Sequence, residues 1–140
     1  MRILAVDYGD ARTGIAISDP TGFLAGETAV IASYRAEEVA AEIARLCEKS
    51  GADRIVVGRP LNMNGTAGER AEKAERFAGR LREVTGLPVE LWDERLTSVD
   101  ANRILSEAGK KRGKQRARVD AVAASLILEG YLGYIKSRKA

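Results

Sequence analysis

Three acidic residues occupy positions from which a folded chain could bring them together. Asp7 follows the apolar run Ile3–Val6, Glu94 comes soon after the run Val89–Trp92, and Asp120 is the second residue of a third apolar stretch. Three carboxylates in one partly buried site repel one another unless cations neutralise them. Two divalent metal ions about 4 Å apart would do so, and they would also activate water and stabilise the leaving oxygen in phosphodiester cleavage.

The composition restricts which metal could be bound. The chain has no histidine and only one cysteine, Cys47, so it lacks the ligands of a zinc finger or a zinc hydrolase. The same absence excludes Ser-His and Cys-His nucleophilic catalysis. The remaining ligands are oxygen atoms, which favour Mg²⁺ or Mn²⁺.

A strongly basic segment directly precedes Asp120. Residues 110–140 have a net charge of +7, whereas residues 1–109 have a net charge of −4. A basic arm attracts phosphates, although a solvated basic tail would look the same in the sequence. Its position beside an acidic residue favours nucleic acid as the partner. The basic residues of the segment are Lys110, Lys111, Arg112, Lys114, Arg116 and Arg118.

Each acidic residue also has an ordinary structural interpretation. Asp7 could cap a turn. Glu94 could be an exposed strand-end acid paired with Arg95, and strand alternation puts Asp93 and Glu94 on opposite faces without showing which one points to a site. Asp120 could interact with the dipole of the helix whose first turn it occupies.

Apolar periodicity predicts an alternation of strands and helices. Gly51 and Gly86 are expected to end the first two helices, and Thr97 and Ser98 to start the third. The basic segment is expected to be a loop before the fourth. The predicted strands cover residues 3–6, 14–17, 24–31, 54–57 and 89–92, and the predicted helices cover about 35–50, 69–85, 98–108 and 119–135. The core side of the second helix is predicted to carry Ala74, Phe77, Ala78, Leu81 and Val84.

This order predicts an α/β fold with a mixed five-stranded sheet and helices on both faces. The first three strands form an antiparallel meander, and right-handed crossovers make the last two parallel to the first. Asp7 and Glu94 are therefore expected at the carboxyl ends of strands, where open α/β sheets place their sites. The 140 residues fit one domain, and the absence of a signal-like leader or a long apolar run predicts a cytoplasmic protein.

Four motifs in this chain resemble the bacterial YqgF (RuvX) family of Holliday junction resolvases, and together they span nearly the whole sequence. They are DYGDARTGIA from Asp7, GRPLNMNG from Gly58, DERLTS from Asp93 and VDAVAASLIL from Val119. Two positions depart from the family pattern: Arg59 replaces a small or apolar residue, and Asn64 replaces a frequent Asp.

The resemblance implies a ribonuclease H-like fold, with Asp7, Glu94 and Asp120 as the acidic triad of an endonuclease-type site. It also implies a function in processing the 5′ end of the pre-16S rRNA, or in resolving four-way DNA junctions. Arg12 and Arg118 stand at positions that are often basic in the family and could contact phosphate. Asn62 and Asn64 could bind phosphate or ribose, although Asn beside Gly is common turn chemistry.

The leading hypothesis is a Mg²⁺- or Mn²⁺-dependent nuclease, monomeric or dimeric, that acts on structured nucleic acid such as an rRNA precursor, also within ribosomal particles. One alternative is a kinase of the actin-like or sugar-kinase type, because Asp7 to Gly14 resembles a phosphate-binding hairpin. Another is a non-catalytic rRNA-binding assembly protein. Seven aromatic residues in 140, with no aromatic-basic pattern, argue against a stacking platform for single strands.

Overall fold

A five-stranded mixed sheet forms the centre of the protein, in the strand order β3-β2-β1-β4-β5. The computed structural model describes residues 1–19, 21, 25–62, 64–94 and 115–139. For residues 25, 115–120, 138 and 139 within these ranges, only the backbone is described. The described elements are β1 (Ile3–Asp7), β2 (Thr13–Ser18), β3 (Ala25–Ile31), α1 (Ala36–Ser50), β4 (Arg54–Arg59), α2 (Glu69–Thr85), β5 (Val89–Asp93) and α4 (Gln115–Lys139).

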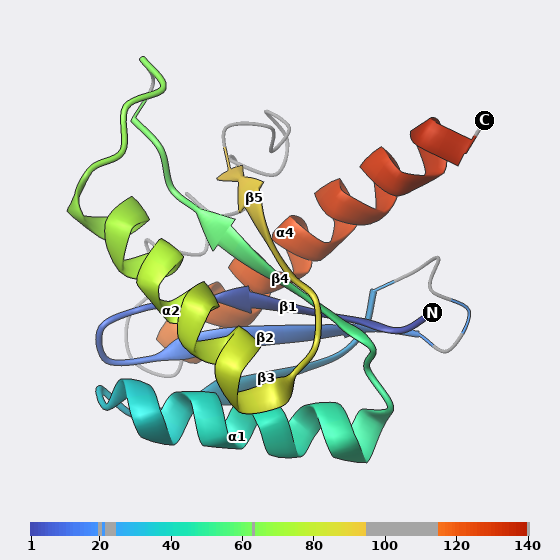
Figure 1. Ribbon diagram of the computed structural model, residues 1–140, viewed down its shortest axis with the longest axis horizontal. Helices are drawn as coiled ribbons and strands as arrows, with labels where there is room; N and C mark the ends of the chain where they lie inside the picture. The colour runs from blue at the N-terminus through green and yellow to red at the C-terminus, as the bar shows by residue number, and fades with distance from the viewer. Residues whose placement is uncertain (20, 22–24, 63, 95–114, 140) are drawn as a thin grey trace.

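The strand pairing confirms the predicted topology. β1 pairs antiparallel with β2, and β2 pairs antiparallel with β3. β1 pairs parallel with β4, and β4 pairs parallel with β5. Helices α1 and α2 cover one face of the sheet and α4 crosses the other, so helices lie on both faces as expected (Figure 1).

Strand alternation divides the core between the two faces. In β1, Leu4 and Val6 pack with α1 and α2, whereas Ile3 and Ala5 pack with α4. The same alternation in β5 places Trp92 on the α4 side. The face to which a strand-end side chain points therefore follows from whether the residue two positions earlier packs with α1 and α2 or with α4.

Helices α1 and α2 end as the sequence predicts. Gly51 and Gly86 follow them in the left-handed conformation, with φ of 77° and 69°, and each donates its N–H to a carbonyl of the last turn. The prediction that Val84 belongs to the core was wrong, because its side chain is 50% exposed. Val84 lies on the same helical face as Phe77, so periodicity alone cannot show that the last turn lies outside the core.

Helix α4 begins earlier than predicted. It starts at Gln115 rather than Val119, so the last part of the basic segment is helical and not a loop. Gln, Arg and Ala are good helix formers, and no Gly or Pro lies between Gly113 and the predicted start at Val119. The predicted third helix, with its start at Thr97 and Ser98, lies outside the described residues. No helix in the described part of the chain is long and apolar enough to cross a membrane.

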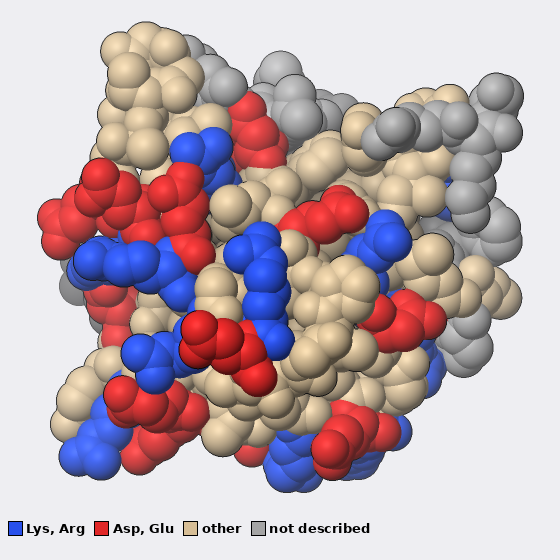
Figure 2. Space-filling model, in the orientation of Figure 1, with Lys and Arg blue, Asp and Glu red and all other residues tan. Residues whose placement is uncertain are grey.

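Figure 2 views the molecule from the side of α1 and α2. Lys and Arg side chains are interleaved there with Asp and Glu side chains. Charged side chains of α1 and α2 form ion pairs on the surface, including Arg45 with Glu42 and Arg80 with Glu37. Surface pairs of this kind contribute little to folding stability, so they can be exchanged for other partners.

Gly9 closes the β1–β2 hairpin by a close backbone approach. A Cβ atom at this position would lie 2.3 Å from the carbonyl oxygen of Arg12. We expect Gly9→Ala to lower the free energy of unfolding by about 2 kcal/mol, because the backbone of the turn must move. The matched control is Gly79→Ala in α2, where nothing lies within 4 Å of the added Cβ. Gly79→Ala should stabilise the protein by about 0.5–1 kcal/mol. Urea denaturation measures both, and equal effects would contradict the steric explanation.

Candidate active site

Asp7 and Glu94 lie at the same edge of the sheet. Asp7 is the last residue of β1, and Glu94 immediately follows β5. Because β1, β4 and β5 run parallel, their carboxyl ends meet at this edge, with β4 between the other two. The prediction that both residues emerge at carboxyl ends of strands is confirmed.

The two carboxylates also share the α4 face of the sheet. Asp7 follows the alternation of Ile3 and Ala5, which pack with α4. Glu94 follows that of Trp92, and its carboxyl group lies close to Gly58 on β4 and near Ile127 of α4. Asp93 therefore points to the opposite face, which resolves the choice that the sequence left open between Asp93 and Glu94.

Gly58 makes the space in which the Glu94 carboxyl group lies. A Cβ atom at position 58 would be 3.2 Å from Cδ and 3.3 Å from Oε2 of Glu94, and 2.5 Å from Cδ1 of Ile127. Gly58 follows Val57, which pairs with Val6, so it lies beside Asp7 in the sheet. On the other side of Asp7, its partner in β2 is Gly14. Asp7 is thus flanked on both neighbouring strands by residues without side chains.

The charge of Glu94 is poorly neutralised. The pKa of Glu94 is raised from 4.5 to about 7, first by burial and then by the negative charges of Asp7 and Asp93, against the positive charge of Arg70, which lowers it. The effect of Asp7 on this pKa means that the two carboxylates are close enough to repel each other. A partly buried pair of like charges favours the binding of a cation.

The donor atoms of this pair fit a hard divalent cation. Carboxylate oxygens are the ligands that Mg²⁺ and Mn²⁺ prefer, and the glycines beside Asp7 leave room next to them. Within the residues whose side chains are described, no group of three or more metal-binding side chains is found. The third acid of the predicted triad, Asp120, falls within α4, and its side chain lies outside the described part.

The hydrogen bonds of Tyr131 fasten α4 to the sheet. Its hydroxyl accepts a hydrogen bond from Nη1 of Arg54 in β4 at 2.8 Å and donates one to Oε2 of Glu90 in β5 at 2.8 Å. The Tyr131 ring meets Trp92 edge-on, with centroids 5.9 Å apart. These contacts orient the helix that carries Asp120.

The structure describes some of the other predicted contact residues. Arg12 is half-buried in the β1–β2 turn and takes part in an interaction there. Arg116 and Arg118 belong to the first turns of α4, where only the backbone is described. The remaining four, Lys110, Lys111, Arg112 and Lys114, lie outside the described residues.

The asparagines of the β4–α2 loop form turn contacts. Nδ2 of Asn62 donates to Oγ1 of Thr66 at 3.0 Å, and the Asn62 carbonyl accepts from the N–H of Gly65 at 2.8 Å. Oδ1 of Asn64 accepts from both N and Oγ1 of Thr66. The structural interpretation is thus confirmed for both residues, and substrate contact by Asn62 stays a prediction.

Two charged residues near the site were given no role from the sequence. Arg70, the second residue of α2, lowers the pKa of Glu94 through its positive charge. Arg59 forms an ion pair with Glu75 of α2 and stands opposite Asp93 in the sheet, so it fastens β4 to the helix. Arg70 adds a positive charge beside the carboxylates, but no local pattern distinguishes it from other surface arginines.

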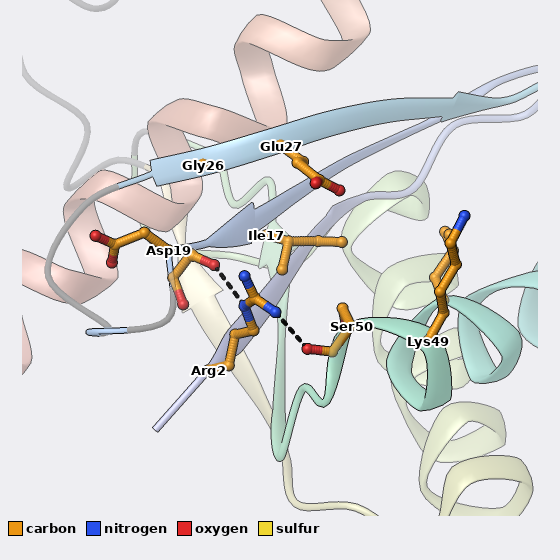
Figure 3. Close-up of a pocket in the computed structure, with 9 residues that line it drawn as sticks. Arg2, Ile17, Asp19, Gly26, Glu27, Lys49 and Ser50 are labelled. Carbon is orange, nitrogen blue, oxygen red and sulfur yellow. Dashed lines mark hydrogen bonds between the residues drawn. The ribbon is translucent and has the colours of Figure 1, made fainter.

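A cavity of about 460 Å³ lies at the opposite edge of the sheet (Figure 3). Arg2 donates hydrogen bonds there to the carbonyl oxygens of Ser18 and Ser50, and so links the ends of β2 and α1. Arg2 precedes the amino end of β1, whereas Asp7 is at its carboxyl end. This cavity is therefore separate from the carboxylate pair.

Known proteins with the same fold include junction resolvases. The Thermus thermophilus RuvC in complex with a Holliday junction substrate superposes with a TM-score of 0.61 at 14% identity, over 96% of each chain. The Fowlpox virus resolvase in complex with Holliday junction DNA gives a TM-score of 0.53 at 12% identity, over 99% of this chain and 98% of the other. At these identities the likeness shows a shared fold, which agrees with the predicted ribonuclease H-like architecture.

Sequence relatives are much closer. A protein of Clostridium acetobutylicum named "Putative pre-16S rRNA nuclease" is 46% identical over 135 residues, covering 96% of this chain and all of the relative. A protein of the same name from Halothermothrix orenii is 46% identical over 134 residues, covering 96% of each. A family model described as "RuvX: Holliday junction resolvase" matches residues 1–134. The resemblance drawn from the four motifs is therefore confirmed, and this chain belongs to the RuvX family.

Proposed function

We propose that this protein is a divalent-metal-dependent nuclease that hydrolyses phosphodiester bonds in structured nucleic acid. The observation that carries the proposal is the pair of carboxylates, Asp7 and Glu94, held together on the α4 face at the carboxyl edge of the sheet. Membership of a family described as resolvases, and close relatives named as nucleases, support the same class of reaction.

Asp7, Glu94 and Asp120 are the residues that would hold the metal. Asp120 occurs four residues before Ala124 and seven before Ile127, so its helical position continues the stripe of α4 that packs on the sheet. When bound, Mg²⁺ or Mn²⁺ would neutralise the carboxylates and activate water for attack on phosphorus. Arg12, Arg118 and the basic segment 110–118 would hold the phosphates of the strand, and Arg70 adds a positive charge near enough to act on Glu94.

The substrate we propose is the 5′ end of the pre-16S rRNA, because the curated relatives of 46% identity carry that name. Such a substrate implies a cytoplasmic protein that acts on ribosomal particles or on free precursor. Four-way DNA junctions are the second candidate, favoured by the description of the matching family model.

A side-by-side cleavage assay tests both substrates. A precursor rRNA fragment and a synthetic four-way junction are incubated with the protein in Mg²⁺, in Mn²⁺ and in chelator, and the products are mapped. Cleavage of the rRNA alone supports the processing function, and symmetric cleavage of the junction supports resolution. Binding without cleavage of either substrate in both metals would favour a non-catalytic assembly protein.

Thermal unfolding tests the metal site without activity. Because the pKa of Glu94 is raised in the folded protein, the fold is more stable when Glu94 is protonated than when it is ionised. This contribution to the free energy of unfolding is present below pH 4.5 and is lost as the pH rises to about 7. At a pH about one unit above that range, in chelator, Glu94→Gln should raise the Tm by roughly 3 °C. In Mn²⁺ the original protein should have the higher Tm, because only the original protein gains stability from binding the ion.

The matched control for this experiment is Glu83→Gln, which removes an exposed carboxylate from α2. It should leave the Tm unchanged in both conditions. Equal Tm values for Glu94→Gln and the original protein in chelator would mean that Glu94 is not under electrostatic strain. An absence of Mn²⁺-dependent stabilisation in the original protein would reject the metal site.

A further inference from the structure

A second cavity, of about 340 Å³, lies at the carboxyl edge of the sheet, on the α1–α2 side. It is formed by the turn after β1, the residues just before and at the start of α1, and one side of α2. Tyr8 lines this cavity and directly follows Asp7 in the chain. Successive residues at a strand end point to opposite faces, so the cavity and the carboxylate pair lie on the two sides of one sheet edge.

The cavity offers aromatic surface from three distant parts of the chain. Tyr8 stacks on Phe77 of α2, with ring centroids 4.0 Å apart and planes 8° apart. Phe77 is buried in the core, which holds the Tyr8 ring in place. Tyr34, just before α1, also lines the cavity and is 80% exposed. Most of the Tyr34 ring is therefore available for stacking against a planar group.

Three basic side chains line the same cavity. Lys73, Arg76 and Arg80 are spaced three and four residues apart in α2, which places them on one face of the helix. Lys73 pairs with Asp10 at 3.2 Å, and Arg80 pairs with Glu37 at 3.6 Å.

The acids in these pairs leave the cations available for other partners. Asp10 and Glu37 are 83% and 77% exposed, so the pairs are weak and a phosphate could replace the carboxylate. Lys73 also pairs with Glu69, which is 80% exposed. No described acidic residue forms an ion pair with Arg76. These basic residues belong to α2, which lies on the side of the sheet that Figure 2 shows, where charges of both signs are interleaved.

We propose that this cavity binds an unpaired nucleotide of the substrate next to the scissile phosphate, with its base stacked on Tyr34 and its phosphates held by Arg76 and Arg80. The combination of an exposed aromatic ring with aligned cations is the arrangement by which proteins bind single strands. The inference rests on the proposed nuclease function for its position beside the cleavage site. It adds that the substrate is single-stranded on one side of the cut.

The test is a binding measurement in chelator, so that it does not depend on cleavage. A short fluorescein-labelled single-stranded RNA, and the same strand annealed to its complement, are titrated by fluorescence anisotropy. Tyr34→Ala should weaken single-strand binding roughly tenfold and leave duplex binding unchanged, because stacking is worth about 1–3 kcal/mol per base. Tyr34→Phe should restore the affinity. Tyr34 is exposed, so neither variant should disturb the fold.

Arg76→Gln should reduce the slope of log affinity against log salt concentration by about 0.7 for the single strand, as expected for one lost phosphate contact. The matched control is Arg45→Gln, which removes an exposed arginine of α1 that pairs with Glu42 in its own helix. It should leave single-strand affinity unchanged.

Two results would overturn the proposal. Unchanged RNA affinity in Tyr34→Ala would assign the cavity to a protein partner or to none, and equal losses for single strand and duplex would indicate a general electrostatic surface. Failure of the nuclease assignment would appear separately, as RNA binding that depends on Tyr34 without cleavage in either metal.

Discussion

Asp7→Asn is expected to reduce phosphodiester cleavage by roughly a thousandfold or more while leaving RNA affinity in chelator unchanged. The substitution keeps the shape of the side chain but removes one negative charge from the carboxylate pair. Metal binding and charge stabilisation in the transition state contribute several kcal/mol, and each 1.4 kcal/mol is about tenfold in rate. Initial rates on the better of the two substrates, in Mg²⁺ and in Mn²⁺, measure the effect.

The matched control for this change is Asp53→Asn. Asp53 is an exposed acid just before β4, at the opposite edge of the sheet from Asp7. The Asp53→Asn protein should cleave the substrate at the original rate. Hydrolysis by purified Asp7→Asn protein at the original rate would remove Asp7 from the catalytic site, whatever the family membership.

Gly58→Ala is expected to lower cleavage by about tenfold to a hundredfold and to destabilise the fold by about 1–3 kcal/mol. The added methyl group would lie 2.5 Å from Cδ1 of Ile127 and 3.2 Å from Cδ of Glu94. Ile127 is 1% exposed, so it cannot move into solvent to relieve the overlap. Either the core or the Glu94 carboxyl group must shift, and both changes are measurable by urea denaturation and initial rates.

A double variant separates the two effects. Ile127→Val removes the methyl group that the new Cβ would meet, and Gly58→Ala/Ile127→Val should recover much of the lost stability. The overlap with Glu94 is unchanged in this protein, so its cleavage rate should stay low. Recovery of rate and stability together would show that Gly58 acts only through packing in the core. Ile127→Val alone is the control for the cost of the missing methyl group.

Local patterns were sufficient for most of the fold. The strands have buried apolar residues, and α1 and α2 end at glycines, so periodicity and end signals agree with the structure to within one or two residues. The start of α4 was misplaced because its first turn is basic rather than apolar. Local signals of this kind depend only on neighbours in the chain, which a single sequence displays directly.

The aromatic and basic residues of the second cavity show what local patterns miss. Tyr8, Tyr34 and Phe77 are far apart in the sequence, so no aromatic-basic motif appears in it. Packing of α1 and α2 on the same face of the sheet brings them together. The expectation that the protein lacks a stacking surface considered only neighbours along the chain.

The sequence alone determined the order of the described strands and helices, the limitation of possible metal ligands to oxygen atoms, and the family. Composition, periodicity and motifs are properties of the chain itself. Only the tertiary structure decided that Glu94 rather than Asp93 shares a face with Asp7, and that Gly58 makes room for its carboxyl group. Those facts depend on how β4 pairs with β5 and on which side α4 packs. Such contacts join residues distant in sequence, and their energies arise only when the whole sheet is assembled.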